Sequence, residues 1–151
     1  RMRGAFHGFF AGVFMITATI GFYQGFRLWR GTVSNVREME VGGIMNAAAC
    51  FFTILSGNWI YIPYRSFGGP RTFFLEMTPQ VQEVFFEFKQ FAALFTLPLA
   101  VSAAFLICRY AEHLNENEEL RDMAALLLIL TFFFFMIPFG LGASITKLMP
   151  V

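Results

Sequence analysis

Charge is missing from most of this sequence. Asp, Glu, Lys and Arg make up 14% of its 151 residues, against roughly 25% in an ordinary soluble domain. The charged residues are confined to the gaps and the ends, and residues 4–26, 41–64, 90–108 and 123–146 contain none. As a helix rising about 1.5 Å per residue, each stretch is long enough to cross a hydrocarbon layer of about 30 Å. The sequence therefore predicts a protein with four membrane spans.

The chain also lacks the residue patterns of common catalytic and redox centres. Cys50 and Cys108 stand alone in different apolar stretches, so neither a zinc site nor a disulfide framework is expected, and both thiols pack as small hydrophobes. An interior without Asp, Glu, Lys or Arg argues against a pump or a coupled transporter. The net charge of +1 gives no reason to expect a nucleic-acid partner. We expect no metal site and no catalytic activity of the chain's own.

The first apolar stretch lacks the features of a cleaved signal peptide. It is longer than the usual apolar region of roughly 7–15 residues, and no Ala-x-Ala-like cleavage site follows it. We therefore expect a membrane span here.

The expected fold is an all-α integral membrane four-helix bundle with antiparallel, up-down helices, formed by one domain over residues 1–151. The spans cover about residues 4–29, 38–62, 84–111 and 122–146, so the N- and C-termini lie on the same side of what we expect to be a bacterial cytoplasmic membrane. Basic residues are divided almost equally between the two sides, which leaves the orientation open. Ser34 is the expected N-cap of the second helix, and Asn115 or Asn117 that of the fourth.

An interfacial loop joins the second and third helices. Gly68-Gly69-Pro70 forces a turn, and residues 71–77 mix apolar and charged side chains. We expect the first turns of the third helix, with Glu83, Glu87 and Lys89, to project from the membrane or to lie against this loop. Basic and aromatic side chains near the span ends are expected to anchor the protein at the headgroups: Arg27, Arg30, Trp59, Tyr61, Tyr64, Arg65 and Arg71.

Small residues recur every four positions in the first span. They form one row at Gly4, Gly8 and Gly12 and, after a slip of one residue, a second row at Thr17, Gly21 and Gly25. Such rows let another helix approach closely, although glycine is also common in membrane helices generally. The partner is either the second helix, whose Asn46, Cys50, Thr53 and Gly57 form a narrow face, or another subunit.

His7 and the 22 phenylalanines are the features that fit a cofactor. Neutral imidazole is a common axial ligand of haem iron, and small neighbours at Gly8 and Gly12 leave room for a macrocycle. Phenylalanine rings can stack on a flat cofactor, but they are also favourable in lipid. An interfacial histidine bonded to water or a carbonyl is the simpler interpretation of His7. His113, at the far end of the third helix, cannot be a second ligand.

Two strings carry a resemblance to a known group of proteins. Tyr61-Ile-Pro-Tyr-Arg65 and Phe86-Glu-Phe-Lys-Gln-Phe91 are similar to segments of small, uncharacterised four-span bacterial membrane proteins. The resemblance implies a haem b-type scaffold with one histidine at the start of the first helix and another near the start of the third. His7 matches the first position, but Phe91 occupies the second. What it implies here is the scaffold, or one axial ligand for a haem or a chlorophyll-type pigment.

Three functions remain open at this point. We expect a non-catalytic accessory subunit of a larger energy-transducing complex, respiratory or photosynthetic, with other membrane subunits and lipids as its partners. The alternative is a small membrane electron carrier, or a subunit holding a haem or pigment, with His7 as the single axial ligand. A membrane enzyme or channel is disfavoured, because the polar side chains in the spans are few and uncharged.

Overall fold

The computed structural model describes residues 2–33 and 35–148, and every regular element in this part of the chain is a helix. Four helices are long and apolar enough to cross a membrane, which confirms that part of the predicted fold and indicates an integral membrane protein. In chain order the elements are α1 (Met2–Trp29), α2 (Val36–Tyr64), α3 (Pro70–Met77), the π-helix η1 (Val81–Phe86), α4 (Glu87–Tyr110), the 3₁₀-helix η2 (Ala111–His113) and α5 (Glu118–Leu148).

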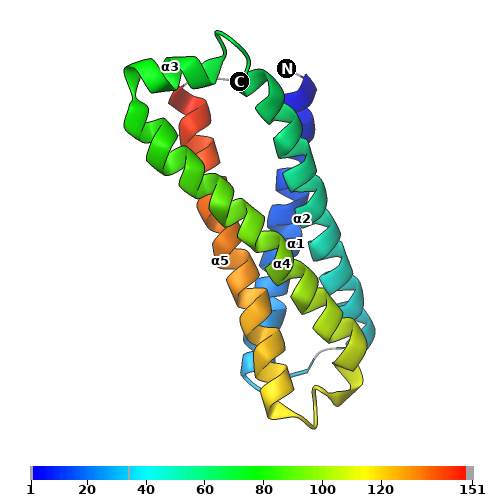
Figure 1. The fold of residues 1–151 in the computed structure, drawn as a ribbon. Coiled ribbons are helices and arrows are strands. Elements are labelled where there is room, and N and C mark those ends of the chain that lie inside the picture. Colours follow the sequence, from blue (N-terminus) through cyan, green and yellow to red (C-terminus); the bar gives the residue numbers. More distant parts are fainter. Residues whose placement is uncertain (1, 34, 149–151) are drawn as a thin grey trace.

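The four long helices lie side by side in a ring of contacts. Helix α1 touches α2 and α5, and α4 likewise touches α2 and α5. The short helix α3 lies across one end of the bundle, at the end where α1 begins and α5 stops (Figure 1). Towards that end the pair α1 and α2 diverges from the pair α4 and α5. We call this the α3 end, and the other the turn end.

Local chemistry explains where the helices stop and start at the turn end. Gly31, at φ +76°, closes α1: the Gly31 N–H donates to the Leu28 carbonyl and the Thr32 N–H to the Arg27 carbonyl, each at 2.8 Å. This left-handed cap favours glycine. Asn35 caps α2, because its Oδ1 accepts from the Arg37 N–H at 2.9 Å. The expected cap, Ser34, lies outside the described residues.

Asn117 is the asparagine that caps α5. Its side-chain Oδ1 accepts a hydrogen bond from the Leu120 N–H at 3.0 Å. Glu118 and Glu119 follow in the first turn, where negative charge is favoured by the helix dipole. The Asn117 cap and the two acidic side chains therefore stabilise the start of a helix whose later turns are apolar.

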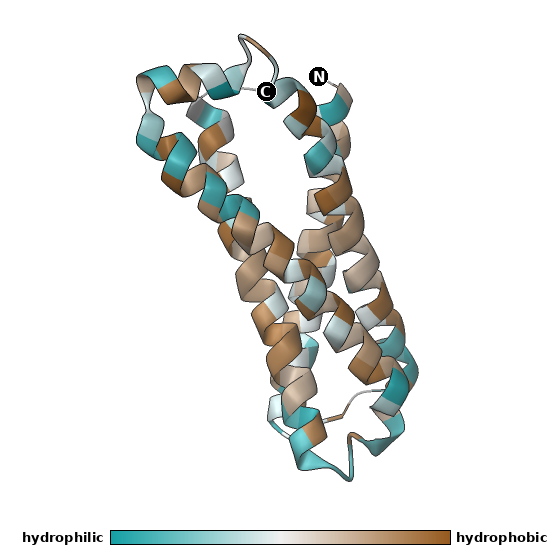
Figure 2. Cartoon of the chain, viewed as in Figure 1, coloured by the Kyte–Doolittle hydropathy of each residue, from teal (hydrophilic) through white to brown (hydrophobic). Residues whose placement is uncertain are grey.

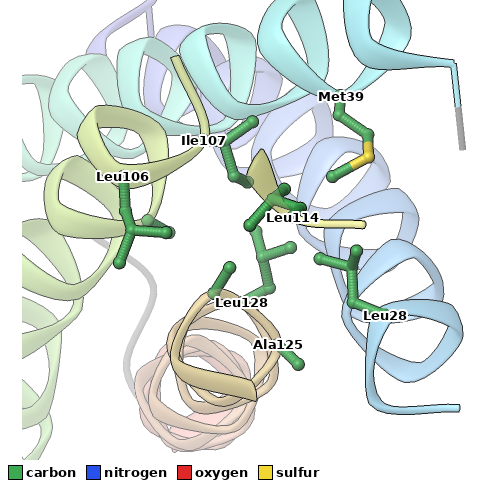
Figure 3. Packing of buried hydrophobic residues seen from close by; sticks show 9 residues of the cluster. Leu28, Met39, Leu106, Ile107, Leu114, Ala125 and Leu128 are labelled. Atoms are coloured by element: carbon green, nitrogen blue, oxygen red, sulfur yellow. The ribbon is translucent and has the colours of Figure 1, made fainter. Parts of the chain in front are cut away.

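Three apolar clusters hold the helices together. One fills the turn end and joins all four long helices, and its larger members point into the common interior (Figure 3). A second lies further along the bundle, where the ring centroids of Phe14 and Phe135 are 4.3 Å apart. The third lies at the α3 end and consists of Tyr64, Phe74, Phe86 and Ile145.

The outer surface is apolar over the length of the bundle. Hydrophilic residues gather towards the two ends, and the middle is mostly hydrophobic (Figure 2). Large side chains on the long helices, such as Phe9 of α1 and Phe105 of α4, are each 65% exposed. An apolar exterior of this extent is costly in water but stable in hydrocarbon. Because lipid can cover these side chains, the helices need to bury only part of their surface against one another.

Candidate functional site at the α3 end

His7 is held between α1 and α2. Its Nδ1 lies 3.1 Å from Ser56 Oγ, and a Cβ atom added at Gly57 would lie 3.2 Å from His7 Cε1. The ring therefore occupies space that any larger residue at position 57 would take. The glycine at position 57, which we expected on a helix-packing face, contacts α1 through this histidine.

The hydrogen bonds around Ser56 favour one tautomer of His7. The Ser56 hydroxyl donates to the Thr53 carbonyl at 3.0 Å, so its single proton is already used. When the hydroxyl donates in this way, Ser56 Oγ is left to accept from His7 Nδ1–H. In the neutral imidazole this leaves Nε2 without a proton, as an acceptor or a ligand atom.

Lys89 lies in the same end of the molecule. Its Nζ stands 4.6 Å from the centre of the Phe86 ring, and its side chain is 3.9 Å from where a Cβ on Gly142 of α5 would be. Among the described residues the only ion pair is Arg121–Glu118, so Lys89 is a cation within a span with no described carboxylate bound to it.

This position differs from the expectation from sequence. We expected Lys89 to project from the membrane or to lie against the preceding loop. In the structure it is half-buried and packs against α5, whereas Glu83 and Glu87 are exposed. The rotation of the third span about its own axis decides this, and sequence spacing does not reveal that rotation.

Tyr61, Tyr64 and Phe86 form an aromatic stack beside Lys89. The Tyr64 and Phe86 rings are 4.5 Å apart and nearly parallel, at 3°, and Tyr61 stacks on both at 5.5 and 5.7 Å. The Arg65 guanidinium lies 4.5 Å from the centre of the Tyr61 ring. Cations placed over ring faces interact favourably with them. The stack joins the end of α2 to η1.

A hydrogen bond reinforces the same joint. The buried Tyr64 hydroxyl donates to Gln82 Oε1, and both side chains are almost completely buried. Tyr64 therefore packs inside the α3 end instead of facing the headgroups, where we expected it. Sequence reasoning missed Gln82 because nothing in its neighbours distinguishes it from an exposed glutamine.

The other expected headgroup residues lie near the ends of the helices. Arg27 and Arg30 stand over the rings of Tyr23 and Phe26 at the turn end. At the α3 end Trp59 carries Arg3 over its ring at 5.3 Å. Arg71 is exposed in the first turn of α3. These positions fit side chains that keep an apolar stem in lipid and a charged tip in water.

The two glycine rows of α1 face different surroundings. A Cβ at Gly21 would lie 3.5 Å from Asn46 of α2, and one at Gly25 would lie 3.0 Å from Ala125 O and Leu128 Cβ of α5. At Gly8 and Gly12, by contrast, a Cβ would meet nothing within 4 Å. Gly4 is exposed as well. The second row packs inside the chain, and the first faces outwards.

Asn46 and Thr53, the polar members of the expected α2 face, satisfy their hydrogen-bonding groups to different extents. Thr53 Oγ1 donates to the Ala49 carbonyl of its own helix at 2.7 Å. Asn46 is 2% exposed, and its Oδ1 has no hydrogen-bond partner among the described residues. A lone buried acceptor of this kind is costly in hydrocarbon.

Within the described residues no group of three or more His, Cys, Asp or Glu side chains is placed to hold a metal ion. His113, in η2, lies at the turn end and is far from His7 (Figure 1). Phe91, at the position where the resemblance implies a second histidine, is 59% exposed. In the part of the chain that the structure describes, the α3 end therefore offers one imidazole, that of His7, and one half-buried ammonium group, that of Lys89.

Comparisons with known proteins found no relative of this chain. No family model matches the chain, no curated protein is significantly similar to it, and no solved structure matches its fold.

Proposed function

We propose that the chain is a non-catalytic subunit of a larger energy-transducing membrane complex of respiratory or photosynthetic electron transfer. It inserts in a bacterial cytoplasmic membrane as an antiparallel, up-down bundle with both termini on one side. Contacts of early α1 with late α2, such as His7 with Gly57, and of late α1 with early α2, such as Gln24 with Gly42, support this arrangement.

The observation that carries the proposal is the open glycine row of α1. Only 17% of the α1 span is buried within the chain, against 28–39% for the other three. On its exposed side Gly8 and Gly12 leave the backbone uncovered. Lipid gives helices no hydrophobic reason to associate, so close backbone approach at small residues is a main source of helix–helix affinity in membranes. A partner helix fits this row.

The test is the composition of the particle that contains the chain. The protein is extracted from its own membrane in mild detergent, purified by an affinity tag, and examined by native electrophoresis and mass spectrometry. We expect other membrane subunits with redox cofactors to co-purify. The double variant Gly8→Leu and Gly12→Leu should release the chain from them, whereas Phe9→Leu and Ile16→Leu, also exposed on α1, should not. A wild-type chain that stays monomeric would refute the proposal.

A second candidate function rests on His7. Because Ser56 takes the Nδ1–H, the Nε2 atom is the one available to a haem iron or to the magnesium of a chlorophyll-type pigment. A haem would supply one-electron transfer, and a pigment would supply light absorption. Ser56 would orient the imidazole, and the Lys89 cation at the same end of the bundle would favour a negatively charged substituent on the cofactor. The one imidazole at this end fits a single axial ligand.

The absorption spectrum of the purified chain distinguishes the second function from the first. A bound haem or pigment should give a visible or near-infrared band that disappears in His7→Ala. In Ser56→Ala the band should shift or lose occupancy, since the ring loses its orienting partner. Thr19→Ala, which removes an exposed hydroxyl elsewhere on α1, serves as the control. A colourless wild-type protein from membranes that make these cofactors would exclude this role.

A further inference from the structure

A groove between α1 and α2 at the turn end has no assigned role. It has a volume of about 550 Å³ and is lined by Thr17, Ile20, Gln24, Arg37, Glu38, Val41, Gly42 and Met45. It lies further along the same helix pair than His7, towards the opposite end of the bundle, and shares no residue with the His7 site. The lining is therefore independent of the function proposed above.

The polar lining residues gather at one end of this groove. Arg37 and Glu38 stand in the first turn of α2, and Gln24 lies near the last turns of α1. Among the described residues neither charge is ion-paired, and the Gln24 amide makes no hydrogen bond. The groove therefore presents a cation, an anion and an amide that the chain itself leaves without partners.

The apolar lining continues from these groups towards the membrane centre. Ile20 and Thr17 precede Gln24 by one and two turns of α1, and Val41 and Met45 follow Glu38 by one and two turns of α2. The Thr17 hydroxyl donates to the Phe14 carbonyl of its own helix, so it adds no free polar group here. The groove thus changes from charged to apolar over roughly 10 Å of depth.

The absence of a side chain at Gly42 shapes the point where the two parts meet. A Cβ atom there would lie 3.1 Å from Gln24 Oε1 and 3.3 Å from Gln24 Nε2. The glutamine amide therefore lies against bare backbone at the boundary between the polar and apolar lining. A phospholipid has the same order of groups, with its ester groups between a charged head and apolar chains.

We propose that this groove binds one phospholipid with a primary ammonium head group, of the phosphatidylethanolamine class. Arg37 binds the phosphate, which the positive end of the α2 dipole also favours. Glu38 accepts hydrogen bonds from the ammonium, Gln24 donates to an ester carbonyl, and an acyl chain lies along Ile20, Val41 and Met45. Charge complementarity selects this occupant, because the groove offers one group of each sign.

The lining also explains why a choline head group fits less well. A quaternary ammonium has no N–H to donate to Glu38, and proteins recognise it with aromatic cages. No aromatic ring lines this groove. A phosphatidylglycerol head group carries no cation, so it would leave the Glu38 carboxylate without an oppositely charged partner. The expected order of affinity is therefore ethanolamine first, then choline and glycerol.

Native mass spectrometry of the full chain in mild detergent tests the proposal. The protein is stripped of lipid and titrated separately with phosphatidylethanolamine, phosphatidylcholine and phosphatidylglycerol that carry identical acyl chains. We expect one ethanolamine lipid to bind about fivefold more tightly than the choline lipid, a ratio typical of the net contribution of one hydrogen bond. Glu38→Gln should remove that preference, and Arg37→Gln should weaken all three lipids.

Two matched variants at the same end of the bundle serve as controls. Glu119→Gln and Arg30→Gln make the same charge changes at exposed residues outside the groove, and both should behave as wild type. Equal binding of ethanolamine and choline lipids by wild type would overturn the proposal. So would tighter binding of phosphatidylglycerol, or an effect of Glu119→Gln as large as that of Glu38→Gln.

Discussion

At the scale of single residues, the two glycine rows of α1 differ in the space that each leaves for a Cβ atom. Gly25 lies against the backbone and Cβ atoms of α5, whereas Gly12 faces open space. Both are glycines in the same helix, so the intrinsic helix propensity lost by each is the same. Any difference in the free energy of unfolding between alanine substitutions at the two positions therefore reports a difference in packing.

Gly25→Ala should destabilise the protein. Its new Cβ would lie 3.0 Å from Ala125 O and Leu128 Cβ, and such overpacking typically costs about 1–3 kcal/mol. Gly12→Ala should be neutral or stabilising by up to ~1 kcal/mol, because alanine favours the helix. Unfolding in mixed micelles with rising dodecyl sulfate, followed by circular dichroism, measures both. Equal stability of the two variants would contradict the packing of α1 on α5.

The buried pair at the α3 end gives a second residue-scale prediction. Tyr64→Phe keeps the stacked ring but leaves the buried Gln82 Oε1 without its donor, so we expect a loss of about 1–3 kcal/mol in the free energy of unfolding. Tyr61→Phe removes a hydroxyl for which no hydrogen bond is seen among the described residues, and it should cost much less. The same micelle titration compares them, and indistinguishable midpoints would count against the Tyr64–Gln82 bond.

At the scale of elements, helix positions follow from the sequence and helix rotations do not. Three of the expected spans lie within single observed helices, for example 38–62 within Val36–Tyr64, and the third, 84–111, covers parts of η1 and η2 as well as α4. Exclusion of charge marks the hydrocarbon-length part of a helix, whereas Arg37 and Glu38 remain helical outside it. The π-helix at residues 81–86 was not anticipated, because an i to i+5 pattern leaves no periodic signal in so short a segment.

The sequence predicts only part of the candidate site, because it does not reveal helix rotations. The residue types of His7, Gly57 and Tyr64 indicate a ligand, a packing position and an interfacial ring, but their contacts depend on how α1, α2 and α4 are turned towards one another. Ser56 is one of several hydroxyls in the spans, and its bond to His7 gives no sequence signal. The sequence predicts that Lys89 projects from the membrane or lies against the preceding loop, because the third helix is longer than a bilayer needs. Only the packed helices show that it points towards α5.

The start of α5 provides an element-scale test. Asn117→Ala removes the acceptor of the Leu120 N–H and should cost about 1 kcal/mol, a typical value for an N-cap. Asn115→Ala, two residues earlier in the same turn, makes no such bond and should be close to neutral. Micelle unfolding again provides the measurement. A larger effect at position 115 would show that the helix begins earlier than Glu118.

At the scale of the whole molecule, the proposed up-down arrangement of four spans would place successive joins on opposite sides of the membrane. In a Cys50→Ala, Cys108→Ala background, single cysteines at Ser66 and at Asn115 report the join after α2 and the join before α5. A membrane-impermeant maleimide applied to sealed vesicles should label one of them, and the other only after permeabilisation. Labelling of both from one side would refute the up-down topology.

The tight turn at Gly31 has a consequence for biogenesis. Few residues separate α1 from α2, and the left-handed cap folds the chain back at once. The two segments can therefore enter the translocon's lateral gate as a preformed helical hairpin. The charges of Arg30, Arg37 and Glu38 then stay together in a single aqueous compartment, and no charged group from this turn has to cross the lipid after the hairpin has been released.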